Sequence, residues 1–191
     1  NVTSTPWYFD MAVWHDTLFV GGQQGSIDGH MYWGIFAYNG IQLIDVGVLD
    51  SPNALEVFND QIYAVGGSAQ LQRYLGGTTW ESVGSTGFYG KDLIVDTINN
   101  FLYTTTGMAA GSPGNMFYTD GVALWNGFYW EKVGYGNGNT SPGTICLELY
   151  RGDIYISPLD SVGGVFTGRL ARWDGQDWHM VGDSTGLKYG L

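Results

Sequence analysis

The segment LARWDGQDWHMVG, residues 170–182, decides how this chain folds. It holds an apolar run that ends in an aromatic, an Asp-Gly pair, and a second run that ends in Val-Gly. Asp-Gly or Asn-Gly between two such runs is the strongest short signal for a β-hairpin, since both turn positions favour positive φ. Residues 38–47, 74–84 and 125–134 end in the same Val-Gly pair after a similar turn. The chain therefore contains four copies of one hairpin.

A second hairpin precedes each of these copies. Its turns are His15-Asp16, Asn59-Asp60, Asn99-Asn100 and Arg151-Gly152. An aromatic recurs just after each turn, at Phe19, Tyr63, Tyr103 and Tyr155, with spacings of 44, 40 and 52 residues. Repeat units of about 40 to 50 residues are typical of β-propeller blades. We therefore expect one domain over residues 1–191, with repeat units at approximately 7–50, 54–90, 92–140 and 145–185.

This repeat predicts an all-β, propeller-like fold of four blades, each with four antiparallel strands. A lone four-stranded sheet cannot bury both of its faces, whereas sheets stacked around an axis bury each other's. The tail, residues 184–191, parallels residues 85–93, so the chain ends where another inner strand would begin. Either the four units close into a ring, or they belong to a larger ring that a longer chain or another chain completes.

The repeat resembles kelch-like repeats, the type found in the central propeller domain of galactose oxidase. The matching residues are the double glycines Gly21-Gly22 and Gly66-Gly67, and the aromatic pair Tyr74 and Trp80. Residues 170–182 look like the repeat of many microbial surface propellers. The third and fourth units lack the double glycine, which departs from the pattern. The resemblance implies a propeller architecture and an extracellular setting, and it carries no catalytic residue.

The composition excludes several classes of partner. The chain has 18 acidic and 7 basic residues, a formal net charge of −11, which repels nucleic acid and anionic membranes. No apolar stretch is long enough to span a bilayer, so we expect no membrane insertion. Cys146 is the one cysteine, so no disulfide can form within the chain, and its apolar neighbours predict that it is buried. Asn1 and Asn139 match the glycosylation acceptor pattern, which matters only in a secretory protein.

Two long, Gly-rich segments, residues 21–32 and 105–120, separate the second and third strands of their units. Variable loops of this kind usually carry recognition, so the aromatics at their ends are the candidate ligand-binding residues: Tyr32, Trp33, Phe117 and Tyr118. By contrast, the repeated Trp80, Trp130 and Trp178 are expected to pack between neighbouring sheets. The three histidines, His15, His30 and His179, occupy unrelated places in the repeat and are expected at the surface.

One set of acidic residues would converge if the innermost strands line a channel. Glu56 and Glu148 share a repeat position, and Asp96 lies close to it in the third unit. Facing carboxylates repel one another, which raises a pKa or recruits a cation, so calcium is a candidate ligand for Glu56, Asp96 and Glu148. The alternative is that these acids simply face channel water. Otherwise the sequence predicts no cofactor.

The leading functional hypothesis is a non-enzymatic recognition or adhesion module at a cell or virion surface, binding a glycan or a protein through its loops. A second is a structural subunit of a virion, fibre or surface filament, with self-association. A third is a hydrolase that uses the channel carboxylates as acid and base. Fold alone does not decide among them.

Overall fold

The computed structural model describes residues 7–27, 29–87, 90–106, 109–135, 146–157, 161–163, 165–166 and 170–182. Within these ranges every regular element is a β-strand and there is no helix. All strand pairs are antiparallel, and no sheet closes on itself. None of the described segments could cross a membrane as a helix. The all-β prediction is therefore confirmed.

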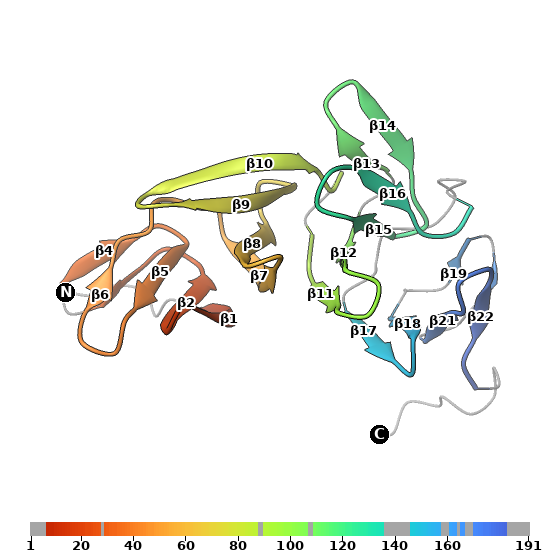
Figure 1. Ribbon diagram of the computed structural model, residues 1–191, viewed down its shortest axis with the longest axis horizontal. Helices are drawn as coiled ribbons and strands as arrows, with labels where there is room; N and C mark the ends of the chain where they lie inside the picture. Colours follow the sequence, from red (N-terminus) through yellow and green to blue (C-terminus); the bar gives the residue numbers. More distant parts are fainter. Residues whose placement is uncertain are drawn as a thin grey trace.

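Four main sheets follow one another along the chain (Figure 1), and three of them consist of four strands whose order in the sheet follows their order in the sequence. The first sheet contains β1 (Tyr8–Trp14), β2 (Thr17–Gly22), β5 (Ile35–Tyr38) and β6 (Leu43–Ile44). The third contains β11 (Leu93–Asp96), β12 (Phe101–Thr105), β15 (Val122–Trp125) and β16 (Trp130–Lys132). The fourth contains β17 (Leu147–Tyr150), β18 (Asp153–Ile156), β21 (Ala171–Trp173) and β22 (Trp178–Met180).

The second sheet differs because it has six strands rather than four. Its own strands are β7 (Pro52–Phe58), β8 (Gln61–Gly66), β9 (Gln70–Gly76) and β10 (Thr79–Ser85). A hairpin from the third unit, β13 (Ala109–Ser112) and β14 (Asn115–Tyr118), joins it where Ser85 pairs with Gly111. Much of the segment 105–120, which was expected to be a loop, is therefore a hairpin, and its role in recognition stays a prediction.

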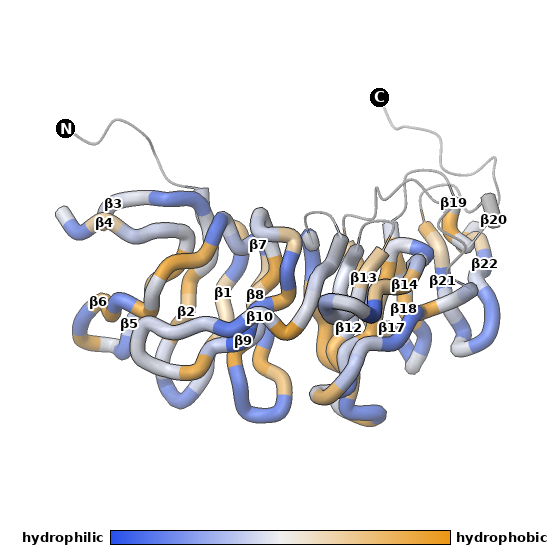
Figure 2. Tube along the Cα trace, turned by 90° about the horizontal axis from the view of Figure 1, so that it is seen from above, coloured by the Kyte–Doolittle hydropathy of each residue, from blue (hydrophilic) through white to orange (hydrophobic). Residues whose placement is uncertain are grey.

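The other insertions also form short hairpins. In the first unit these are β3 (Gly25–Ile27) and β4 (His30–Tyr32), and in the fourth β19 (Ser161–Val162) and β20 (Val165–Phe166). Figure 2 shows hydrophobic residues mainly along the strands and hydrophilic residues mainly at the turns. This distribution fits sheets that pack on one another through their faces.

Three of the four inner turns follow the prediction, but most outer turns do not. His15-Asp16, Asn59-Asp60 and Arg151-Gly152 have positive φ at both turn positions, as a two-residue hairpin requires. At Asn99-Asn100 only Asn100 has positive φ, because Asp96 pairs with Phe101 and the turn is longer. In the outer turns at Asn39-Gly40, Asn126-Gly127 and Asp174-Gly175 only the glycine has positive φ. The Asn or Asp side chain instead accepts two backbone N–H groups, as Asn39 Oδ1 does from Ile41 and Gln42. This Asx turn spans four residues, which the Asn-Gly pair alone does not reveal.

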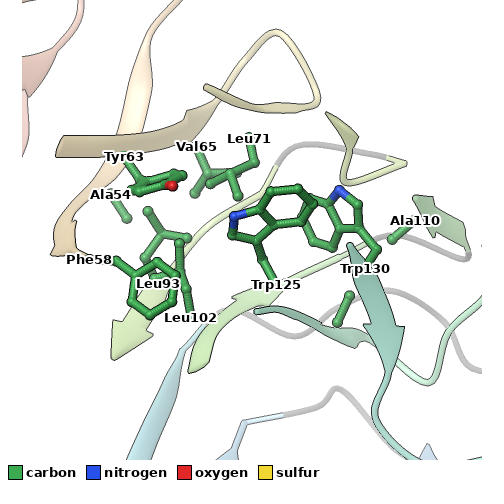
Figure 3. Close-up of a cluster of buried hydrophobic side chains, with 11 residues drawn as sticks. Ala54, Phe58, Tyr63, Val65, Leu71, Leu93, Leu102, Ala110, Trp125 and Trp130 are labelled. Carbon is green, nitrogen blue, oxygen red and sulfur yellow. The ribbon is translucent and has the colours of Figure 1, made fainter. Parts of the chain in front are cut away.

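The hydrophobic core consists of three clusters, each between two consecutive sheets. Ala12 and Phe19 of the first sheet meet Leu55 and Ile62 of the second, and the same arrangement recurs between the second and third sheets and between the third and fourth. In the cluster of Figure 3, Trp125 and Trp130 lie side by side, with ring centroids 5.5 Å apart, facing the second sheet. Within the described residues no fourth cluster joins the fourth sheet to the first.

The repeated tryptophans pack between neighbouring sheets at these junctions, as expected. Trp80 Nε1 donates to the carbonyl of Val46 at 2.7 Å, and Trp130 Nε1 donates to that of Val83 at 3.0 Å. Each accepting valine belongs to the preceding sheet's Val-Gly pair. The glycine is required there: a Cβ on Gly84 would lie 2.2 Å from Trp130 Nε1. At the first two junctions the Val-Gly pair therefore accepts the hydrogen bond of the next unit's tryptophan. At the third junction a Cβ on Gly134 would lie 2.6 Å from Trp178 Nε1, so the glycine is required there too, although Trp178 Nε1 has no hydrogen-bond partner among the described residues.

Cys146 is exposed, so the expectation of burial is wrong. It lies just before β17, where its N–H donates to Ser157 Oγ at 3.2 Å and its carbonyl accepts from the Ser157 N–H at 3.1 Å. The core of the fourth sheet begins one residue later, at Leu147. Asn1, Asn139 and the tail, residues 184–191, lie outside the described residues.

Candidate functional site

A groove with a volume of about 540 Å³ opens at the outer edge of the junction between the first and second sheets. We call it the first-junction groove. One wall comes from the end of β4 and the segment after β6, and the other from β9 and the start of β10. Its lining residues are Met31, Tyr32, Trp33, Asp45, Gly47, Val48, Gln72, Thr78, Thr79 and Trp80.

Trp33 is held by its backbone while its side chain stays accessible. Its carbonyl accepts the N–H of Leu49 at 3.0 Å, which fixes the segment after β4 against the segment after β6. The chain turns sharply at the next residue, Gly34, with φ of +85°, and a Cβ there would lie 1.8 Å from the carbonyl of Leu49. The side chain of Trp33 is nevertheless 52% exposed. The sequence therefore presents an indole from a rigid position.

The opposite wall presents the edge of a second indole and several polar groups. Trp80 is fixed by its hydrogen bond to Val46 and by the ring of Tyr74, 5.0 Å away, yet it still lines the groove. Asp45, which lies on the same wall as Trp33, is exposed, and its Oδ1 accepts the N–H of Gly47 at 2.9 Å. Burial, and then the charge of Asp45, raise the pKa of Tyr74, so its hydroxyl stays protonated and donates to the carbonyl of Gly77.

This lining suits a neutral ligand rich in hydroxyl groups. Aromatic side chains offer apolar faces for C–H groups, while a carboxylate, an amide and two threonine hydroxyls offer acceptors and donors around them. Asp45 is the one carboxylate among the lining residues. Hydrolysis of a glycosidic bond normally needs two carboxyl groups across the bond.

The equivalent position at the third junction is occupied by the protein itself. Tyr135 follows Gly134 just as Val48 follows Gly47, and Tyr135 Oη donates to Asp177 Oδ1 at 2.6 Å. That hydrogen bond raises the pKa of Tyr135. Lys132, at the position of Asp45, donates to the carbonyl of Tyr135 at 3.1 Å.

The second junction is also occupied, by strand pairing. Ser85, the residue after Gly84, pairs with Gly111 of β13. The hairpin β13–β14 therefore lies where the other junctions have a groove or a tyrosine. Of the three junctions between described sheets, the first thus has the residues and the space to accept a ligand.

The structure separates the four predicted ligand-binding aromatics. Tyr32 and Trp33 both line the first-junction groove, with the Tyr32 ring 5.1 Å from that of Phe36. Phe117 and Tyr118 lie on β14 of the second sheet, far along the chain. Phe117 packs against the second core cluster, and Tyr118 is 62% exposed. The binding role expected for Phe117 and Tyr118 stays a prediction, and neither residue lines the first-junction groove.

The predicted channel acids are brought together only in part. Glu56 interacts electrostatically with Asp10 and Asp92, and Asp92 interacts with Asp10 and Glu148. Each of the four sheets thus supplies one carboxylate near its inner strand. Asp10, Glu56 and Glu148 lie within β1, β7 and β17, and Asp92 lies just before β11. Burial raises the pKa of Glu56 and of Asp92, and the neighbouring charges raise them further.

Asp96 does not belong to this set, so its placement in the channel was wrong. Its Oδ1 accepts the N–H groups of Ile98 and Asn99, and its Oδ2 accepts the Asn99 side-chain amide at 2.7 Å. These hydrogen bonds outweigh burial and lower the pKa of Asp96. The carboxylate of Asp96 therefore caps the turn that follows β11, instead of joining the other inner acids.

Asp10 and Asp92 were missed by sequence reasoning, and both link neighbouring inner strands. Asp10 Oδ2 accepts the N–H of Leu55 at 2.8 Å, and Asp92 Oδ2 accepts that of Leu147 at 2.8 Å. Across the described part of the chain, no three His, Cys, Asp or Glu side chains gather so as to hold a metal ion. Asp10 and Asp92 thus tie neighbouring sheets together through backbone N–H groups, whereas Glu56 and Glu148 accept the N–H of the next residue in their own strands.

The histidines lie at or near the surface, and two of them pair with aspartates. His15 Nε2 is 2.9 Å from Asp60 Oδ1, which joins the inner turns of the first two sheets. His179 Nε2 is 2.6 Å from Asp174 Oδ2, and Asp174 also caps its own turn. The backbone hydrogen bonds of that cap, together with His179, lower the pKa of Asp174. None of the three histidines lines the first-junction groove.

The chain matches no protein-family model and no curated protein. Its structure is similar to a crystal structure of the extracellular domain of a B. thetaiotaomicron protein assigned to the hybrid two-component systems. The TM-score is 0.61 at 17% sequence identity, over 94% of this chain and 23% of that chain. This chain therefore spans about a quarter of the length of the protein it resembles. At this identity, the likeness shows a shared all-β fold.

Proposed function

We propose that this chain is an extracellular recognition module that binds a neutral glycan in the first-junction groove. The observation that carries the proposal is Trp33, whose indole is 52% exposed on a fixed backbone beside Trp80. A sugar ring presents C–H groups on one face and hydroxyls at its edge. Such a ligand can stack on an indole while Asp45, Gln72 and the threonines bond its hydroxyls.

Two further features support the proposal. The net charge of −11 disfavours anionic ligands such as nucleic acid. The similar structure named above is that of an extracellular domain. We further propose that the four sheets are blades of a β-propeller of the kelch-like kind, because consecutive sheets pack face to face through the same repeat positions. The junctions between blades are then where a ligand would bind.

The test is a glycan-array screen followed by calorimetry on the glycans that bind. Removing the indole in Trp33→Ala should weaken binding by about tenfold, which corresponds to about 1.4 kcal/mol and lies within the usual worth of an aromatic stacking contact. The unfolding midpoint should not change, since the side chain is half exposed. Phe128→Ala is the matched control, because Phe128 is 87% exposed in a turn outside the groove.

Two results would contradict the proposal. If no glycan binds, or if Trp33→Ala and Phe128→Ala bind alike, the groove is not a glycan site. If the bound glycan is cleaved, as measured by new reducing ends, the module is an enzyme and the single carboxylate of the groove has been misjudged.

A further inference from the structure

The outward face of the first sheet is apolar, and no other described sheet packs on it. Strand register places its residues in two rows on the side opposite the first core cluster: Met11, Val20 and Phe36 in one, and Val13, Leu18, Tyr38 and Leu43 in the other. Val20 and Phe36 are buried, because the rings of Tyr8 and Tyr32 pack against Phe36, so the accessible part of the face is Met11 and the second row. The face carries no formal charge. Val13 is 65% exposed and Met11 is 62% exposed. We call this surface the leading face.

The same face is buried on the following sheets. Met11 and Val13 correspond in the repeat to Leu55 and Val57 of the second sheet, which pack in the first core cluster against Ala12 and Phe19. On the fourth sheet the corresponding Leu147 and Leu149 pack in the third cluster. At all three junctions of the described chain, the face that corresponds to the leading face is therefore covered by the opposite face of the preceding sheet.

The outward face of the fourth sheet supplies the complementary half. Its central row is Glu148, Tyr155, Arg172 and His179. The corresponding row of the second sheet, Glu56, Tyr63, Arg73 and Glu81, faces the third sheet. We call the surface of the fourth sheet the trailing face.

The trailing face keeps an aromatic where the second sheet buries one. Phe58, at the end of β7, is 1% exposed in the second core cluster. Tyr150 has the same position on β17 and is 53% exposed. Arg172 is paired with Asp153 at 3.0 Å, just as Arg73 is paired with Glu81. A charged row of this kind is therefore compatible with a sheet-to-sheet junction, because the second junction already contains one.

The two unpartnered faces lie at opposite ends of the molecule. In Figure 1 the sheets fan out from their inner strands, with the first sheet at the left and the fourth at the right. The inner strands approach one another closely enough for Asp92 to interact with both Asp10 and Glu148. The described residues of one chain therefore form an open fan in which neither the leading face nor the trailing face packs on another described sheet.

We propose that two copies of this chain associate head to tail, the leading face of each docking on the trailing face of the other. The contact joins two different surfaces, and it closes because the second junction is identical to the first. The occupant of the leading face is thus the fourth sheet of a second copy. The resulting ring repeats the junction that already holds each chain together. The proposal does not depend on ligand binding in the first-junction groove.

Sedimentation velocity at increasing protein concentration tests the proposal. We expect a species of twice the 20.9 kDa chain mass, favoured by physiological salt, because a net charge of −11 opposes association when screening is weak. Val13→Glu on the leading face and Tyr150→Glu on the trailing face should each give a monomer. Both residues are exposed in one chain, so neither substitution removes a core contact. Ile98→Glu is the matched control, because Ile98 is 88% exposed away from both faces.

Mixing the two monomeric variants distinguishes head-to-tail docking from contact between two leading faces. Val13→Glu retains a sound trailing face and Tyr150→Glu a sound leading face, so an equimolar mixture should recover a dimer through one junction. That dimer should be weaker, since the second junction no longer closes the ring. A wild-type monomer at all concentrations and salts would overturn the proposal. So would a Tyr150→Glu dimer, a series of species larger than a dimer, or an equal loss in Ile98→Glu.

Discussion

Removing the side chain of Trp130 should destabilise this fold strongly. Its side chain is 8% exposed in the core cluster between the second and third sheets, and its indole N–H donates to Val83 at 3.0 Å. A buried aromatic covers roughly 150–250 Å², and truncation of Phe or Trp to alanine in a core costs about 3–5 kcal/mol. Trp130→Ala should therefore lower the free energy of unfolding by about 3–5 kcal/mol.

A second substitution separates the packing from the hydrogen bond. Trp130→Phe keeps an aromatic ring in the junction but leaves the Val83 carbonyl without its donor, which should cost about 1–3 kcal/mol. Urea unfolding followed by circular dichroism and by fluorescence measures both losses, and coincident transitions establish that the fold melts as one unit. A loss below about 1 kcal/mol for Trp130→Ala would mean that the tryptophan does not hold the sheets together, and the junction argument would fail.

Two other predictions concern the junctions and the inner acids. Gly84→Ala should destabilise the chain by about 1–3 kcal/mol, because its Cβ would meet the Trp130 ring and φ at this position is +154°; a melting temperature equal to that of the unmutated chain would contradict this. Glu56 keeps its proton to a higher pH in the folded chain than in the unfolded chain, so stability should fall as pH rises through that window. Glu56→Gln should flatten this decline and raise the melting temperature at neutral pH, because a glutamine oxygen can still accept the N–H of Val57; an unchanged pH profile would show that Glu56 ionises freely.

The local parts of the fold could be predicted from the sequence, because their causes are local. A two-residue hairpin needs positive φ at two adjacent residues. His15-Asp16 and Asn59-Asp60 lie between apolar runs, which predicts such hairpins, and both pairs have positive φ. The junction tryptophan was predictable for a similar reason. A large apolar residue that recurs at one repeat position must be buried, and stacked sheets offer the junction as the place.

The parts that failed depend on contacts between units, or on a local hydrogen bond that competes with the role expected from the repeat. The hairpin at residues 109–118 joins the second sheet through the pairing of Ser85 with Gly111, which nothing near either residue indicates. Asp96 was assigned to the channel by its neighbours in the repeat, but the adjacent turn offered its carboxylate three hydrogen-bond donors. Local capping of this kind competes directly with longer-range roles for aspartate.

Some of the residues that line the candidate groove could be predicted from the sequence, and others could not. Tyr32 and Trp33 were singled out because they end a Gly-rich segment, and both line the groove. Asp45 and Thr78 were not, because they come from different units and meet only when the first two sheets pack. The sequence nevertheless contained one signal for the groove. The residues beside each Val-Gly pair face the turn of the next unit, so a difference in residue type there indicates that the junctions differ.

The residue after that glycine is where the three junctions diverge. The glycine must stay, because the next tryptophan or its turn occupies the space of a side chain at Gly47, Gly84 and Gly134. The following residue does not share this constraint. Ser85 extends the sheet by pairing with β13, and the hydroxyl of the tyrosine after Gly134 bonds the facing turn. Val48 has no hydroxyl that could bond the facing turn, and it is 67% exposed beside the groove. A repeat that keeps its Val-Gly pair for packing can thus vary the residue after it, and this variation explains how one junction of a repetitive fold acquires a groove where its copies have a paired hairpin or a tyrosine.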